Sequence, residues 1–182
     1  RRRDRLPESP ALPSEETTLR VLGVDPGTFK MGIGLLDSID GELPPVHAGV
    51  LTARRGQSLD RRLHHLYGEL LNVICEWRPG VVAVEAPFVA TNVRAAMAVG
   101  QAQAVAMVAA ASQGIPVSGY SPREVKRAVT DYGGSSKEQV QEMVGVLLGL
   151  DQIPEPSDVA DALAVAICHI NASRIGDLDV RE

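Results

Sequence analysis

Two carboxylates in this sequence each end a short apolar run. Asp25 closes the first such run and is followed directly by a Pro-Gly pair, while Glu85 closes the run Val81–Val84 and precedes Ala-Pro. Apolar runs of this kind predict buried strands, and sites in open α/β sheets form where strands end. We therefore expect both carboxylates at one sheet edge. For Asp25, the alternative is an ordinary capping role in an Asp-Pro-Gly turn.

A second pair of carboxylates, Asp158 and Asp161, stands three residues apart near the end of the chain. The surrounding pattern predicts a helix whose core side carries Val159 and Leu163, and residues three apart on a helix share a face. The two side chains would then point the same way. The alternative is that acidic residues in the first turn simply stabilise the helix dipole.

Taken together, four carboxylates around one point would repel and raise one another's pKa unless cations neutralised them. Few Lys or Arg residues stand beside them in the sequence. Hard divalent ions that prefer oxygen ligands, Mg²⁺ or Mn²⁺, are the natural partners of such a group. A pair of these ions would activate water and stabilise the leaving oxygen in phosphodiester cleavage.

The elements that must position these residues begin with a hairpin over Arg20–Asp37, whose returning strand contains Gly32–Leu36. Val46–Ala53 is predicted as a third strand, giving a meander. Apolar residues then recur at steps of three and four over Leu59–Trp77, which predicts an amphipathic helix with Ser58 as its cap. Val81–Val84 is the fourth strand.

The second half of the chain is predicted to be largely helical. A long Ala- and Met-rich helix over Asn92–Gln113 precedes a turn and a short fifth strand ending near Tyr120. Three helices follow, over Pro122–Thr130, Ser136–Leu150 and Ser157–Arg174. This order predicts an α/β fold with a five-stranded mixed sheet flanked by helices.

Length and composition favour a single globular domain, since the chain has 182 residues and is 45% hydrophobic. We expect a disordered N-terminal extension over 1–18, one domain over 19–175 and a C-terminal tail over 176–182. The extension lacks the apolar core of a signal peptide, and no run approaches the roughly 18 apolar residues of a membrane span. The expected protein is soluble and cytoplasmic, with no membrane partner.

The formal net charge of −5 does not exclude a polyanionic partner, because basic residues gather in patches. These patches contain Arg54, Arg55, Arg61 and Arg62, and then Arg123, Lys126 and Arg127. The two cysteines, Cys75 and Cys168, both stand in apolar helical patterns, so we expect buried free thiols.

Several separate motifs, in order over about residues 20–170, resemble those of the RuvC family of Holliday-junction resolvases. The motifs are Gly23–Gly27, Val84–Glu85 with Phe88 and Asn92 after it, Gly100–Ala102, Val125–Arg127, Lys137 with Gln139–Val140, and Asp158–Ala164. The resemblance implies an RNase H-like fold and symmetric paired nicking of four-way DNA junctions with Mg²⁺ or Mn²⁺. It makes Asp25, Glu85, Asp158 and Asp161 the catalytic, metal-binding residues, with two ions per site.

The same resemblance implies further roles. Phe88 matches an aromatic that stacks on an unpaired base near the junction centre, and Lys126 and Lys137 match lysines that contact DNA, with core packing or a solvated face as the alternatives. The other expected DNA-binding residues are Arg54, Arg55 and Arg127. The family also implies a homodimer, which the Asn92–Gln113 helix would form, and a branch-migration motor as partner.

Three alternatives to this function stay open at this point. The chain could be a related RNase H-like nuclease for other structured nucleic acids, or a junction-binding protein without catalysis. The Gly-Val-Asp-Pro-Gly-Thr hairpin at Gly23–Thr28 also resembles the phosphate loop of actin- and sugar-kinase-like ATP-binding domains. That fold needs two such domains and an adenosine site, for which 182 residues leave no room.

Overall fold

The computed structural model describes residues 18–87 and 93–179, and within these ranges the chain forms five strands and five helices. The elements in chain order are β1 (Leu19–Asp25), β2 (Lys30–Ser38), β3 (Pro45–Thr52), α1 (Leu59–Trp77), β4 (Val81–Glu85), α2 (Val93–Ser112), β5 (Val117–Tyr120), α3 (Pro122–Thr130), α4 (Lys137–Leu147) and α5 (Ser157–Asp179). This order agrees with the elements predicted from the sequence.

The strands form one mixed sheet in the order β3-β2-β1-β4-β5. The meander β1-β2-β3 is antiparallel, whereas β4 runs parallel to β1 and β5 runs parallel to β4. Consequently β1, β3, β4 and β5 all point their carboxyl ends to the same edge of the sheet. The predicted five-stranded mixed sheet is confirmed.

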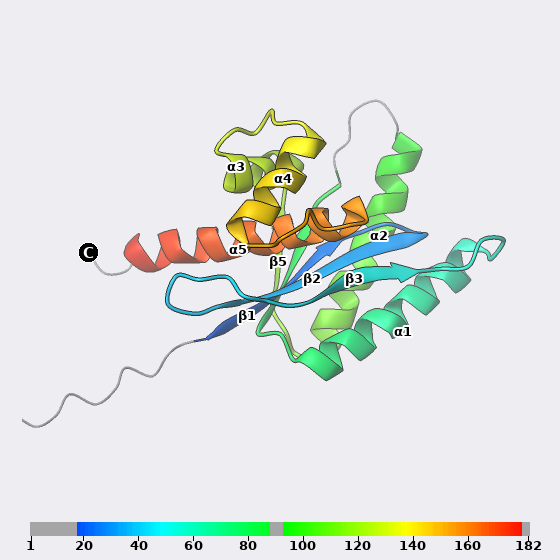
Figure 1. Ribbon diagram of the computed structural model, residues 1–182. Helices are drawn as coiled ribbons and strands as arrows, with labels where there is room; N and C mark the ends of the chain where they lie inside the picture. Colours follow the sequence, from blue (N-terminus) through cyan, green and yellow to red (C-terminus); the bar gives the residue numbers. More distant parts are fainter. Residues whose placement is uncertain (1–17, 88–92, 180–182) are drawn as a thin grey trace, which may run out of the picture.

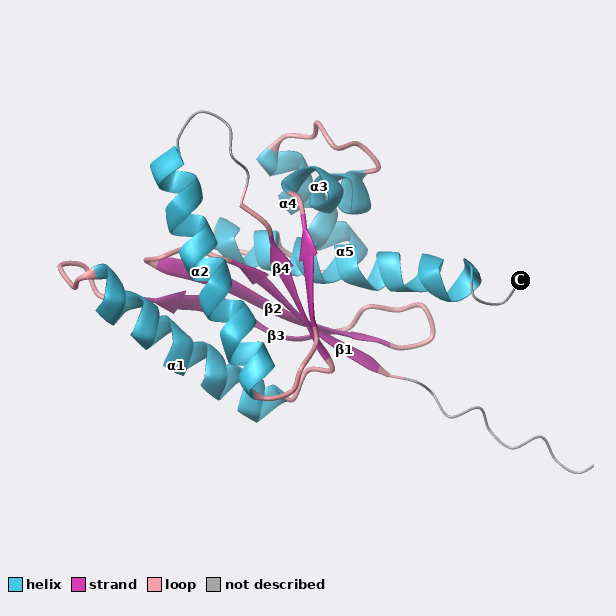
Figure 2. Cartoon of the chain, turned by 180° about the vertical axis from the view of Figure 1, so that it is seen from behind, coloured by secondary structure: helices cyan, strands magenta, loops and turns pink. Residues whose placement is uncertain are grey.

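Helices cover both faces of the sheet. Figure 1 shows α3, α4 and α5 on one side and α1 with α2 on the other, and Figure 2, seen from behind, shows α1 and α2 lying across their face together. Alternation along β1 divides its side chains between the layers. Val21 belongs to the core under α5, while Leu22 and Val24 belong to the core under α1 and α2.

Some boundaries differ from those predicted. Helix α4 ends at Leu147 instead of Leu150, because Gly149 adopts a left-handed conformation (φ 61°) that terminates helices. Helix α5 continues to Asp179, beyond the predicted end at Arg174. Ser58 occupies the predicted N-cap position of α1, but its side chain makes no capping hydrogen bond.

The expectation for the cysteines is half right. Both are free thiols, and Cys168 is buried in the core under α5. Cys75 is exposed, because the buried stripe of α1 runs through Leu70, Val73 and Ile74 and leaves the next position facing outward.

The expectation that no stretch resembles a membrane span is wrong for α2. Among the described residues, this helix alone is long and apolar enough to cross a membrane by length and composition. Its contacts are nevertheless those of a helix that covers a sheet, since the small residues Ala102, Ala106, Ala109 and Ala110 are buried in the core with β1, β2 and β4. Small side chains let the helix backbone approach the sheet closely.

Candidate active site

Asp25 and Glu85 end adjoining strands at the same edge of the sheet. Strands β1 and β4 are parallel neighbours, and Val24 is in register with Val84. The next residue on each strand is a carboxylate, so Asp25 and Glu85 occupy equivalent positions side by side. The structure therefore places both where the apolar runs predicted them.

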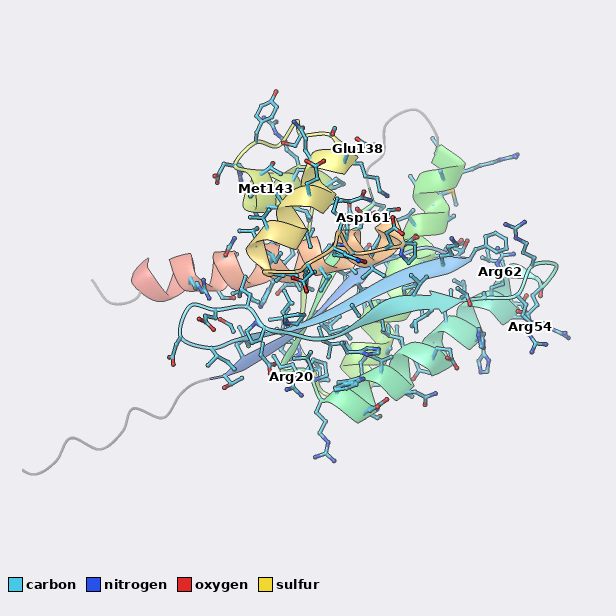
Figure 3. The ribbon with its side chains drawn as sticks, viewed as in Figure 1. Arg20, Arg54, Arg62, Glu138, Met143 and Asp161 are labelled. Carbon is cyan, nitrogen blue, oxygen red and sulfur yellow. The ribbon has the colours of Figure 1, made fainter. Side chains whose placement is uncertain are left out.

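Helix α5 brings the second carboxylate pair to this edge because glycines let its backbone rest directly on the sheet. A Cβ atom at Gly23 would overlap with the carbonyl oxygen of Ala162, and one at Gly32 would overlap with the carbonyl oxygen of Asp158. Close contact of backbone with backbone thus fixes the first turns of α5 above β1 and β2. Figure 3 shows Asp161 on the part of α5 that lies over the sheet.

The two carboxylates that end the strands, Asp25 and Glu85, are partly buried beside other negative charges. Burial, together with the negative charges of Asp161 and Asp158, raises the pKa of Asp25 to about 6. Burial likewise raises the pKa of Glu85 to about 7, aided by the charges of Asp25 and Asp161. A cation at this position would oppose these shifts, because an opposite charge favours the ionised form.

The four carboxylates do not form a closed metal cage. Within the parts of the chain that the structure describes, no three His, Cys, Asp or Glu side chains are arranged to hold a metal ion together. Mg²⁺ does not require such a cage, since it usually keeps several waters and binds through one or two carboxylates plus substrate phosphates. The donor set of oxygen ligands therefore fits a hard divalent ion that also binds the substrate.

One lysine is already paired with this carboxylate group. The Nζ atom of Lys137 lies 2.6 Å from Oδ2 of Asp161. Burial tends to lower the pKa of Lys137, but the hydrogen bond and the charge of Asp161 outweigh it, so the pKa is raised. Few cations neighbour the acids in the sequence, but folding places Lys137, the first residue of α4, against Asp161 of α5.

A capping motif that the sequence reasoning missed positions Lys137. The Ser136 hydroxyl accepts from the backbone N–H of Gln139, and the Gln139 side chain accepts from the backbone N–H of Ser136. This capping box fixes the start of α4 and hence its first residue, Lys137. The Ser-x-x-Gln spacing was the available signal.

Lys126 completes the surroundings of the carboxylates. Its Nζ atom donates to the carbonyl of Ser135 at 2.8 Å, and its charge acts on Glu85. A cavity of about 230 Å³ lies between α3, α4, α5 and β4 and is lined by both lysines together with Glu85 and Asp161. Both predicted lysines thus lie at the carboxylate site.

The remaining predicted DNA-binding residues lie elsewhere. Arg54 and Arg55 are exposed in the loop between β3 and α1. Arg127 is exposed on α3 and lines a separate hollow with Tyr120 and Arg174, so the structure does not bring it into the carboxylate cavity. Phe88 lies outside the described residues.

Comparison with known proteins gives consistent matches. The family model described as crossover junction endodeoxyribonuclease RuvC matches residues 21–169. The crossover junction endodeoxyribonuclease RuvC of Dehalococcoides mccartyi is 48% identical over 151 residues, which cover 83% of this chain and 90% of that protein. Its counterpart in Chloroflexus aurantiacus is 49% identical over 83% of this chain and 92% of that protein.

A solved structure agrees with these sequence matches. RuvC of Thermus thermophilus in complex with a Holliday junction substrate superposes with a TM-score of 0.81 at 35% identity, covering 87% of this chain and 96% of that one. The likeness extends over almost the whole of the other protein's chain.

Proposed function

Because this chain belongs to the RuvC family of crossover junction endodeoxyribonucleases and shares its RNase H-like fold, we propose that it resolves four-way (Holliday) DNA junctions by symmetric paired nicks. One structural observation supports a hydrolytic mechanism. Three separate elements, β1, β4 and α5, deliver four carboxylates to one sheet edge, beside a cavity that holds two lysines. An acidic group with adjacent cations suits the hydrolysis of a phosphodiester.

We propose that Asp25, Glu85, Asp158 and Asp161 together hold Mg²⁺ or Mn²⁺, two ions in each site. Bound ions of this kind lower the pKa of a water molecule and neutralise charge on the attacking and leaving oxygens. The raised pKa values of Asp25 and Glu85 support the assignment. Burial and neighbouring negative charges disfavour the ionised form of each carboxylate, and a bound cation would stabilise that form.

Lys137 and Lys126 are assigned to the phosphate of the strand being cut. Both lysines line the cavity beside Glu85 and Asp161, so either would be able to donate to a phosphate oxygen bound there. An ammonium group aimed at developing negative charge stabilises a transition state electrostatically. Lys137 is the stronger candidate because it already contacts a carboxylate of the site.

Other contacts with junction DNA are proposed from residue type and, for the three arginines, from exposure. Phe88 would stack on an unpaired base near the junction centre, where aromatic stacking is worth about 1–3 kcal/mol. The exposed Arg54 and Arg55 would contact duplex arms, and Arg127 would do so from α3. Phosphate contacts of this kind supply affinity without sequence information.

We propose assembly as a homodimer through α2, a proposal supported by the apolar residues that this helix leaves exposed. Its outward side carries Val93, Met97, Met107 and Val108, each between 46% and 61% exposed. A two-fold dimer would cover this surface and place two active sites against a two-fold junction. We further propose that residues 19–175 are the nuclease domain, that the protein acts in the cytoplasm, and that a branch-migration motor is its partner.

The test is incubation of the purified protein with a synthetic four-way junction, a linear duplex and a single strand, each with and without Mg²⁺ or Mn²⁺. We expect symmetric nicks in two strands of the junction, dependent on the metal ion, with the duplex and the single strand intact. Equal cutting of all three DNAs would instead indicate a less selective nuclease. Tight junction binding without cutting under any metal would indicate a binding protein.

A further inference from the structure

An exposed aromatic ring stands in the turn between β1 and β2, four residues after Asp25. Phe29 is 45% exposed, and the guanidinium carbon of Arg62 lies 3.9 Å from the centre of its ring. A guanidinium over an aromatic face is a favourable cation–π contact. The ring is therefore held in a defined position at the surface instead of packing into the core.

Arg62 is itself fixed by the backbone of two loops. Its Nε donates to the carbonyl of Thr28 at 3.1 Å, and its Nη1 donates to the carbonyl of Gln57 at 3.0 Å. The backbone N–H of Ala53 also donates to the carbonyl of Phe29 at 2.9 Å. These bonds tie the β1–β2 turn to the loop after β3 and place the guanidinium over the ring. We call the two side chains the Phe29–Arg62 platform.

The platform borders a hollow of about 790 Å³ whose charged lining residues are all positive. The hollow is lined by Gly27, Thr28, Phe29, Lys30, Thr52, Ala53, Arg55 and Gly56. Two of these residues are cations and none is an acid. Asp60, the nearby acidic residue of α1, lines a different hollow together with Arg61 and His64.

This hollow opens at the same edge of the sheet as the carboxylates. Gly27 follows Asp25 by two residues, and Lys30 pairs with Thr52 at the carboxyl end of β3, which points in the same direction as β1 and β4. Figure 3 shows Arg54 and Arg62 together at this end of the sheet.

We propose that the hollow binds the phosphodiester backbone of a junction arm next to the scissile phosphate, an inference that rests on the proposed function. Phe29 would pack against a deoxyribose, and Lys30 and Arg55 would each neutralise a phosphate. Arg62 acts as a positioning residue. Its two hydrogen bonds to carbonyls fix the guanidinium, and the guanidinium contacts the face of the Phe29 ring. An apolar ring flanked by Lys30 and Arg55, which form no ion pair within the described residues, matches a chain of alternating sugars and phosphates.

The test separates the charged contacts from the apolar one. In the inactive Asp25→Asn background, affinity for a four-way junction is measured by fluorescence anisotropy over a series of salt concentrations. Lys30→Gln and Arg55→Gln should each weaken binding and reduce the slope of log K against log salt by about 0.9, the value for one lost phosphate contact. Phe29→Ala should weaken binding about fivefold with no change of slope, because it removes apolar contact only.

Two further variants test the positioning role and the location. Arg62→Lys keeps the charge but loses the planar fork that reaches both carbonyls, so it should weaken binding as Phe29→Ala does. Arg78→Gln removes an exposed Arg at the opposite end of α1 and should change neither the affinity nor the slope. Thermal unfolding of every variant checks the fold, and Phe29→Leu replaces Phe29→Ala should the latter be destabilised.

Unchanged affinity and slope in Lys30→Gln, Arg55→Gln and Phe29→Ala, with tight binding by the parent protein, would overturn this inference and leave the proposed function standing. An equal loss of affinity in Arg78→Gln would also overturn the inference, because the losses would then reflect the net charge of the protein and not contacts in the hollow. A wild-type protein that fails to cut junctions would contradict the proposed function instead. The same variants titrated with linear duplex would then still decide whether the hollow binds a DNA backbone.

Discussion

Lys137, the first residue of α4, and Asp161, in the second turn of α5, form an ion pair of 2.6 Å at the candidate active site. The pair joins α4 to α5 beside the two carboxylates that end β1 and β4. It supplies one positive charge to a group of four acids, and this charge opposes the rise in the pKa of both Asp25 and Glu85. The site thus contains an internal counterion.

We expect Gly23→Ala to destabilise the protein by about 2 kcal/mol or more and to abolish nicking. An added Cβ would overlap with the carbonyl oxygen of Ala162, and overpacking of this kind forces backbone shifts. Moving α5 would separate Asp161 from Asp25. Urea unfolding and the nicking assay measure both effects, with Gly49→Ala, which has open space around it, as the matched control. Equal stability of the two variants would contradict the close packing of α5.

Asp25→Asn should reduce metal-dependent nicking at least about 100-fold while junction binding persists, because the substitution removes one charged ligand but no surface that contacts DNA. Single-turnover nicking and anisotropy binding measure the two properties separately. Asp60→Asn, which removes an exposed carboxylate of α1, is the control. Full nicking by Asp25→Asn would remove this residue from the metal site.

Lys137→Ala should slow nicking about 10- to 100-fold, because the phosphate loses an ammonium partner. Its effect on stability should be small, about 0.2–1 kcal/mol, since the lysine is 53% exposed and water screens the ion pair. Nicking at saturating junction and urea unfolding are the measurements, and Glu138→Gln, at the next position, is the control. A large loss of stability with normal nicking would make Lys137 a structural residue only.

The metal-free protein should lose stability as the pH rises from about 4 to about 7. The folded-state pKa values of Asp25, about 6, and Glu85, about 7, lie above their ordinary values, so the folded protein binds more protons in this range and the free energy of unfolding falls with pH. The loss should amount to about 1–3 kcal/mol.

Urea unfolding in the presence of a chelator, at pH 5 and at pH 8, measures this dependence. Glu85→Gln should flatten the profile and be more stable than the wild type at pH 8, whereas Glu76→Gln on α1 should leave it unchanged. Affinity for Mg²⁺ should rise over the same range as the carboxylates ionise. A profile that is equally steep in Glu85→Gln would refute the raised pKa of this residue.

Phe88→Ala should reduce junction cutting by roughly 5- to 100-fold and change the melting temperature little, since loss of one stacked base costs about 1–3 kcal/mol of binding. Phe88→Trp should restore activity because it keeps a stacking face. Cutting rates and thermal unfolding are measured together. A strongly lowered melting temperature with undiminished cutting would place Phe88 in the core.

The sequence by itself determined the elements, their order and the positions of the four acids. Apolar runs ending at Asp25 and Glu85, and the helical spacing of Asp158 and Asp161, are local patterns, and local patterns report which side of an element is buried. A mixed sheet could be anticipated because a meander followed by alternating helices and strands leaves few sheet arrangements.

Only the tertiary structure decided which residues surround these acids. Lys137 meets Asp161 across two helices, and Arg62 meets Phe29 across a loop and a turn. Periodicity does not specify such contacts, because it encodes the burial of a face but not the neighbour that covers it. The close approach of α5 to Gly23 and Gly32 is likewise a tertiary feature. A glycine in a strand does not reveal which backbone packs against it until the fold is known.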